Sequence, residues 1–248
     1  LSVGAVVALT AVTVAKIHDM DVNIWIAVAA GFAVGPIVGL SNGLLVTKVG
    51  INPLITTLGT MSIVRGLAFV LTGGLTGTIL DSGFAVIGRG EVVGIPVPLI
   101  ILIIWFVIAS IVMSYTRFGR DLYSIGGNAE ASRLAGIPVD RRKIAVYVIS
   151  GSAASVAGIV LASQLGAGAP QSAAGVELTV ITAVILGGTS LSGGKGTVWG
   201  TMLGVFIMGV LNNGLALLRV SSFYQEVFRG AVLLLAVAMD QLGQRRRR

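Results

Sequence analysis

The sequence predicts an all-α protein, a polytopic transmembrane helical bundle. Of the 248 residues, 55% are hydrophobic and only 11% are charged, against about 25% charged in an average soluble domain. A mean hydropathy of +0.96 leaves too few polar residues to cover a surface that faces water. Eight apolar runs between charged residues have, or approach, the length of a bilayer crossing: about 1–15, 24–46, 54–71, 97–115, 144–165, 176–189, 198–218 and 225–240.

The first run is notable for how it begins, and the second for its proline and its regularly spaced glycines. The first begins at Leu1, without a methionine or a basic leader, so we expect the single transmembrane domain, 1–248, to be N-terminally incomplete. The second contains Pro36, which removes one backbone hydrogen bond and should kink the helix. Glycines recur there at every fourth residue, along one side of a helix: Gly31, Gly35, Gly39 and Gly43. Their missing side chains let another helix pack closely, or let this helix flex in a working cycle.

The third and fourth runs, 54–71 and 97–115, are joined by a glycine-rich segment, 72–96, that is too short for a domain. Arg65 lies near the end of the third run, close enough for its side chain to snorkel to the bilayer surface. We therefore expect Arg65 to anchor its helix.

The later runs complete the bundle. Run 176–189, at a rise of about 1.5 Å per residue, reaches only about 21 Å, the length of a broken or re-entrant helix. Run 198–218 contains two adjacent asparagines in otherwise apolar surroundings. After the last run the chain ends in a basic tail, 241–248.

Lysine and arginine are distributed unequally between the two sides of the bilayer. When the runs are threaded alternately, 12 of the 17 lysines and arginines fall on one side and three on the other, and two lie inside runs. Cytoplasmic loops hold the excess of positive charge. The loop 116–143 and the C-terminus are therefore expected to be cytoplasmic.

The cytoplasmic loop contains GGNAEASRLAGIP, residues 126–138, which has its own helix start and stop signals. Asn128 is a good N-cap, Gly136 suits the left-handed position after a helix, and Pro138 prevents continuation. The enclosed helix, of about two turns, has a small apolar face: Ala131, Leu134 and Ala135. Such a face is suited to a groove on a soluble partner, and a helix lying on the bilayer surface is the alternative.

A second glycine-rich string, 187–197, superficially resembles nucleotide-binding motifs. LSGGK is close to the signature of ABC ATPases, but a phosphate loop needs G-x-x-x-x-G-K-[ST], and here Thr189 occupies the first position and Gly196 follows the lysine. We expect instead a tight cytoplasmic turn between two spans, in which glycines provide the turn geometry and a lysine the orientation. The residues of this turn are Gly187, Gly188, Gly193, Gly194 and Lys195.

Several functional classes are excluded by what the chain lacks. With no Cys and one His, it has no disulfides, thiolate sites or multi-His zinc site, and we predict no metal site. No nucleophile with a base and no carboxylate pair lies in a span, so catalysis is not expected. All ten acidic residues lie in loops or at run ends, whereas ion-coupled carriers place acidic groups within the membrane. The net charge of +7 includes four tail arginines and does not indicate nucleic acid.

Three motifs resemble the ribose and simple-sugar permease family of bacterial ABC importers: GRDLYSIGGNAEASRLAGI at 119–137, VILGGTSLSGGKGT at 184–197 and LNNG at 211–214. The opening LSVGAVVALT and the stretch NPLITTLGTMSIVRGLAFVLTGG at 52–74 are also similar to the family, so the resemblance covers essentially the whole chain. Relatives continue upstream of Leu1 by enough for about two more spans, so a full-length relative would have about ten.

The resemblance implies a multi-pass permease subunit of the bacterial inner membrane that translocates a monosaccharide and is not itself an enzyme. It implies a second permease copy in a homodimer, a cytoplasmic ABC ATPase that binds ATP and Mg, and a periplasmic or lipid-anchored sugar-binding protein. No cofactor is expected in this chain. The loop helix would be the coupling helix, which the closing ATPase pair would push. Six residues match the family pattern there: Gly127, Asn128, Glu130, Arg133, Gly136 and Ile137. To these we add Ala131 and Leu134 from the apolar face.

A path for a neutral sugar needs hydroxyl and amide groups rather than charges. The spans offer Thr56 and Thr60, one turn apart, and the pair Asn212 and Asn213. Intramembrane Asn also commonly bonds a neighbouring helix, so packing is the alternative for the pair. At the level of function, the alternatives are an ion-coupled secondary transporter of a small polar solute and an ABC permease for a nucleoside or another non-sugar solute.

Overall fold

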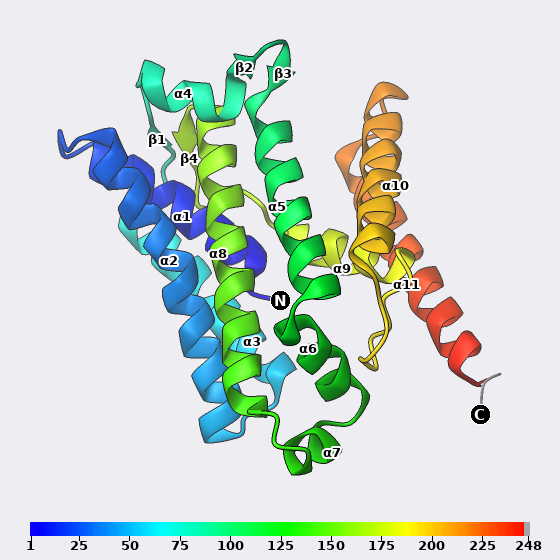
Figure 1. Cartoon of the computed structure of the whole chain (residues 1–248). Coiled ribbons are helices and arrows are strands. Elements are labelled where there is room, and N and C mark those ends of the chain that lie inside the picture. Colours follow the sequence, from blue (N-terminus) through cyan, green and yellow to red (C-terminus); the bar gives the residue numbers. More distant parts are fainter. Residues whose placement is uncertain (246–248) are drawn as a thin grey trace. The chain divides into compact units, whose positions relative to one another are not determined.

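The structure, a computed structural model, describes the backbone of residues 1–245 and the side chains of residues 1–239, so the whole predicted tail, 241–248, lies outside the described side chains. The described chain consists of eleven α-helices, one π-helical turn and four two-residue strands (Figure 1). The predicted all-α class is therefore confirmed. The chain divides into two compact units: Leu1–Ile104 with Asp140–Ala174, and Trp105–Val139 with the residues from Gly175 onward.

Helix α1 (Val3–His18) is the most buried helix described in the first unit. Eleven of its residues are buried, all of them Gly, Ala, Val, Leu or Thr. It packs against α2 (Ile24–Leu44), α3 (Pro53–Thr72) and β4 (Ala167–Gly168). A helix that is apolar on every side is suited to this interior position.

The glycine side of α2 faces two other helices of the first unit. At Gly31, a Cβ would lie 2.6 Å from Val14 Cγ2 of α1. A Cβ at Gly35 or Gly39 would overlap a backbone carbonyl oxygen of α8 (Val139–Leu165), and one at Gly43 would lie 3.0 Å from Ile144 Cα. Because glycine has no Cβ, α2 and α8 approach at backbone distance. Beyond α2 the chain continues as the π-helical turn η1 (Leu45–Val49).

The segment 72–96, which the sequence predicts only as a glycine-rich connection, contains regular structure. Helix α4 (Ser82–Arg89) follows β1 (Gly77–Thr78), which pairs antiparallel with β4, and β2 (Glu91–Val92) pairs with β3 (Ile95–Pro96). Ser163 near the end of α8 fixes α4: its Oγ accepts from Gly88 N–H at 2.7 Å and donates to Phe84 O at 2.6 Å.

The second unit contains the short helix predicted within 126–138, the helix that precedes it, which was not predicted, and the last spans. Its helices are α6 (Arg117–Gly127), α7 (Ala129–Leu134), α9 (Val176–Leu186), α10 (Val198–Leu217) and α11 (Ser222–Arg245). Helix α9 packs against α10 and α11. Helix α5 (Val97–Tyr115) belongs to the first unit up to Ile104 and to the second from Trp105.

Each of the eight predicted runs forms a helix. Six helices in the described residues are long and apolar enough to cross a membrane, namely α2 with η1, α3, α5, α8, α10 and α11. The other two, α1 and α9, have 16 and 11 residues, so the predicted count of about eight spans holds only approximately. None of the residues of α5 is buried, and α10 and α11 expose large side chains such as Trp199 and Phe223, as surfaces in lipid do.

Candidate functional site

Helix α7 has only six residues, and caps define both of its ends. Asn128 Oδ1 accepts hydrogen bonds from the N–H groups of Glu130 and Ala131, both at 3.0 Å. After the helix, Gly136 has a φ of 84°, and the N–H groups of Gly136 and Ile137 donate to carbonyls of the last turn, each at 3.0 Å. This is the Schellman arrangement, which needs a residue that tolerates positive φ. The predicted N-cap and the predicted left-handed glycine are confirmed.

The apolar face of α7 points away from the rest of its unit. Leu134 is 83% exposed, and Ala131 and Ala135 are exposed as well. Ser132, in contrast, is buried, and its Oγ donates to Asn128 O at 2.8 Å. A short helix held by its own caps therefore presents a leucine to its surroundings, which is typical of a docking surface.

Helix α6 leads directly into α7. The Thr116 hydroxyl caps its start by accepting from Gly119 N–H at 3.3 Å, while donating to Val112 O of α5 at 2.6 Å. Its last residue, Gly127, is followed by the N-cap of α7, so only Asn128 separates the two helices. Capping side chains thus fix the start of α6 and its junction with α7, and a backbone cap at Gly136 closes the end of α7.

Residues 187–197, called here the glycine turn, form a tight connection between α9 and α10, as the sequence predicts. Ser190 N–H donates to Lys195 O at 3.1 Å, and Gly193 N–H donates to Ser190 O at 3.2 Å. Gly193 and Gly194 have φ values of 87° and 72°, which residues with a Cβ rarely adopt. The Lys195 side chain is exposed.

The glycine turn lies directly on α6. A Cβ at Gly126 would overlap Gly194 N, and one at Gly193 would lie 2.6 Å from Gly126 O. Tyr123 of α6 donates its hydroxyl to Gly196 O at 2.9 Å. Neither Tyr123 nor Gly126 was predicted as a site residue; the available signal was a pair of adjacent glycines in each segment.

The four candidate path residues lie in two separate groups. Thr56 is buried and its Oγ1 has no hydrogen-bond partner among the described residues, whereas Thr60 Oγ1 donates to Thr56 O at 3.0 Å within the same helix. Asn212 Oδ1 accepts from Arg229 Nε of α11 at 3.1 Å, and Asn213 is exposed. The geometry of Asn212 favours the helix-packing alternative.

A small cavity with a mixed polar and apolar lining lies elsewhere in the first unit, beside polar residues that were not predicted as site residues. Asn42 of α2 is 3% exposed, and its Nδ2 donates to Ser2 Oγ at 3.1 Å. With Thr57 and Tyr147 it lines a cavity of about 60 Å³. That volume holds a few water molecules rather than an organic solute.

The snorkelling of Arg65 stays a prediction, and its guanidinium group bonds to another segment of the first unit. Its Nη1 donates to Pro170 O at 2.9 Å and to Ser172 O at 2.8 Å, in the irregular segment after β4. These carbonyl groups lie outside any helix, where they need hydrogen-bond donors from elsewhere in the chain, and Arg65 supplies them. Arg65 is therefore a clamp between α3 and this segment.

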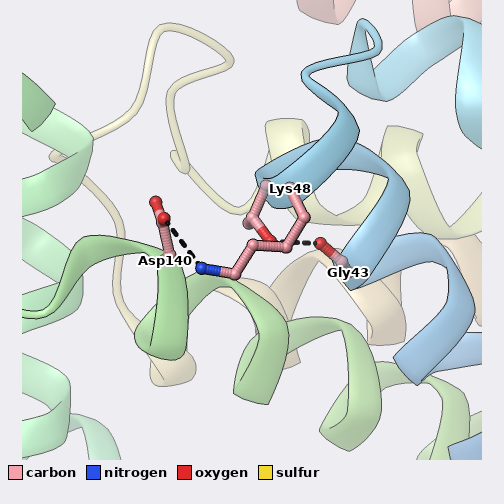
Figure 2. Close-up of polar contacts among 4 residues, drawn as sticks. Gly43, Lys48 and Asp140 are labelled. Atoms are coloured by element: carbon pink, nitrogen blue, oxygen red, sulfur yellow. Dashed lines mark hydrogen bonds and ion pairs between the residues drawn. The ribbon is translucent and has the colours of Figure 1, made fainter.

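Lys48 and Asp140 of the first unit form an ion pair. Figure 2 shows Lys48 of η1 reaching Asp140 at the start of α8, with an Nζ–Oδ2 distance of 3.6 Å. Thr47 Oγ1 donates to Gly43 O at 2.7 Å beside it. Because the two charged side chains are 63% and 36% exposed, the pair contributes little to stability.

The chain is similar to known permease proteins over nearly its whole length. Residues 1–237 match the family described as "Branched-chain amino acid transport system / permease component". Over 243 residues it is 46% identical to the ribose import permease protein RbsC of Bacillus subtilis (strain 168), covering 97% of this chain and 76% of that protein. It is 43% identical over 248 residues to the L-arabinose transport system permease protein AraH of Escherichia coli (strain K12), covering 100% and 76%. No solved structure matches the chain.

Proposed function

Since the chain belongs to the family of branched-chain amino acid transport system / permease components, we propose that it is the membrane-spanning permease subunit of an ABC importer for a monosaccharide. The observation that carries this function is the family match across residues 1–237. The sugar class is supported by two relatives named for ribose and L-arabinose, each more than 40% identical to this chain. The chain hydrolyses no ATP in this proposal; a separate ATPase subunit does so.

The orientation in the bacterial inner membrane follows from the positive charge. We place the loop 116–143, the glycine turn and the C-terminus on the cytoplasmic side, because the excess of lysine and arginine lies there. Lys48 and Asp140, which pair across the ends of two spans, belong to the same side. A sugar-binding protein delivers the solute to the opposite side, and a second copy of the chain completes the permease.

Helix α7 is the contact with the ATPase in this proposal. Its exposed Leu134 enters an apolar groove on the ATPase, and Glu130 and Arg133 lie at the edge of that contact. The caps at Asn128 and Gly136 keep the helix folded before it docks, so that no ordering cost opposes binding. Closure of the ATPase pair on ATP pushes α7, and the spans change between outward and inward openings.

Stoichiometric co-purification tests the partner, with one substitution to test the contact. The full-length protein is extracted in mild detergent and its companions are identified by mass spectrometry; we expect a soluble ATPase with nucleotide-binding sites. Leu134→Asp puts a charge into the groove and should weaken the ATPase contact by at least about tenfold, since a buried leucine contributes about 1.5–3 kcal/mol.

The matched control is Leu80→Asp. Leu80 is 90% exposed and lies just before α4, in the segment 72–96, which alternate threading of the runs places on the side opposite the loop 116–143. The control should retain the ATPase. Equal retention by both variants would refute the role of α7, and absence of any ATPase would refute the importer.

A further inference from the structure

The contact between α6 and the glycine turn consists of backbone against backbone. Gly126 of α6 has no room for a Cβ because Gly194 N lies there, and Gly193 has none because Gly126 O lies 2.6 Å from the position. At Gly194, a Cβ would lie 2.9 Å from Gly127 N. Three glycines thus bring two segments more than 60 residues apart in the chain into direct contact, and a shift of one backbone displaces the other.

One side-chain hydrogen bond reinforces this contact. The Tyr123 hydroxyl donates to Gly196 O at 2.9 Å and is part-buried. Tyr123 and Gly126 are one turn apart on α6, so they hold the glycine turn at two points. Next to these points lies a cavity of about 330 Å³, whose lining includes Leu122, Val184 and Thr201. The backbone contacts at Gly126 and the Tyr123 hydrogen bond thus join the two segments at defined atoms.

The glycine turn is also joined rigidly to α9 and α10, the two helices that it connects. A Cβ at Gly187 would overlap Gly200 O, and one at Gly204 would overlap Ala183 O, so α9 and α10 also meet backbone to backbone. Thr197 caps α10, accepting from Gly200 N–H at 3.0 Å. Movement of the glycine turn is passed to the near ends of α9 and α10, because no flexible side chains separate them.

We propose that this contact is the joint through which α7 drives α9 and α10, and that Tyr123 and Gly126 are positioning residues for energy coupling. The proposal rests on the proposed function, in which the ATPase pushes α7. Because α7 follows α6 after the single residue Asn128, displacement of α7 moves the end of α6 that carries Gly126. The glycine turn follows, and with it the two membrane helices.

The test is the ratio of sugar transported to ATP hydrolysed by the complete transporter in proteoliposomes. Tyr123→Phe removes only the hydroxyl, and Gly126→Ala forces the two backbones apart. Both variants should keep the ATPase bound and hydrolysing ATP while the transport ratio falls at least about fivefold, the lower end of usual coupling free energies. Gly209→Ala on α10 is the control, because a Cβ there meets nothing within 4 Å, and its ratio should equal that of the wild type.

The possible results distinguish failure of the proposed joint from failure of the proposed importer function. A wild-type transporter that binds no ATPase would overturn the proposed function and the joint with it. If the wild type transports and Tyr123→Phe keeps the full ratio, the joint is overturned even where Gly126→Ala fails to fold. Loss of ATPase binding in step with loss of transport would also overturn it, because the contact would then only support the shape of α7.

Discussion

Replacing Gly35 by alanine should destabilise the protein measurably. The new Cβ would overlap Gly151 O of α8, and the reciprocal Cβ at Gly151 would lie against Gly35 O. Both obstacles are helical backbone and cannot rotate away, so the cost lies at the upper end of the overpacking range, about 3 kcal/mol. Alanine recovers about 1 kcal/mol of helix propensity over glycine. The net loss is about 2 kcal/mol, or roughly 4–8 °C in Tm for a chain of this size.

Gly59→Ala is the matched control for that experiment. Gly59 lies within α3, where a Cβ would meet nothing within 4 Å, so only the propensity gain applies and stability should hold or rise slightly. Thermal unfolding of both variants in the same detergent, followed by tryptophan fluorescence, gives the comparison. If Gly35→Ala unfolds at the same temperature as Gly59→Ala or above it, the close packing of α2 on α8 is refuted.

Three further substitutions have defined outcomes. Arg65→Met removes the donor from two part-buried carbonyls, which costs about 1–3 kcal/mol; hydrogen exchange across 167–175 should quicken, and unchanged exchange would contradict the clamp. Asn128→Ala removes the N-cap of α7, worth about 1 kcal/mol, and should weaken ATPase binding about fivefold by titration, whereas Asn128→Asp should bind like wild type. Asp140→Asn breaks the exposed pair with Lys48 and should lower unfolding free energy by less than about 1 kcal/mol; a larger loss in denaturant would show that solvent screens the pair less than its exposure indicates.

Features set by neighbouring residues could be predicted from the sequence. The ends of α7 follow from Asn128 and Gly136, because capping involves groups only a few residues apart. All eight apolar runs became helices because, in lipid, a helix satisfies its backbone internally. The short reach of run 176–189 was also visible from its length, and α9 has 11 residues.

Features set by distant partners could not be predicted. Arg65 lies near a span end, where snorkelling is the default, yet its acceptors are more than 100 residues away. Gly126 contacts Gly194, but the glycines of both segments are already explained by the local structure of a helix end and a turn. Their presence in the sequence therefore does not indicate that the two segments meet. Helix α4 is only eight residues long, and its docking depends on Ser163 of another helix. In each case a single amino-acid sequence does not indicate which distant residue of the same chain the fold brings into contact.

Uptake of a labelled monosaccharide into proteoliposomes tests the central claim most directly. The vesicles contain the full-length permease with its co-purified ATPase, and the sugar is supplied with its binding protein. We predict uptake with ATP on the side of α7 and none with a non-hydrolysable analogue. Uptake that ignores ATP and follows an imposed proton or sodium gradient would contradict the importer and indicate an ion-coupled carrier.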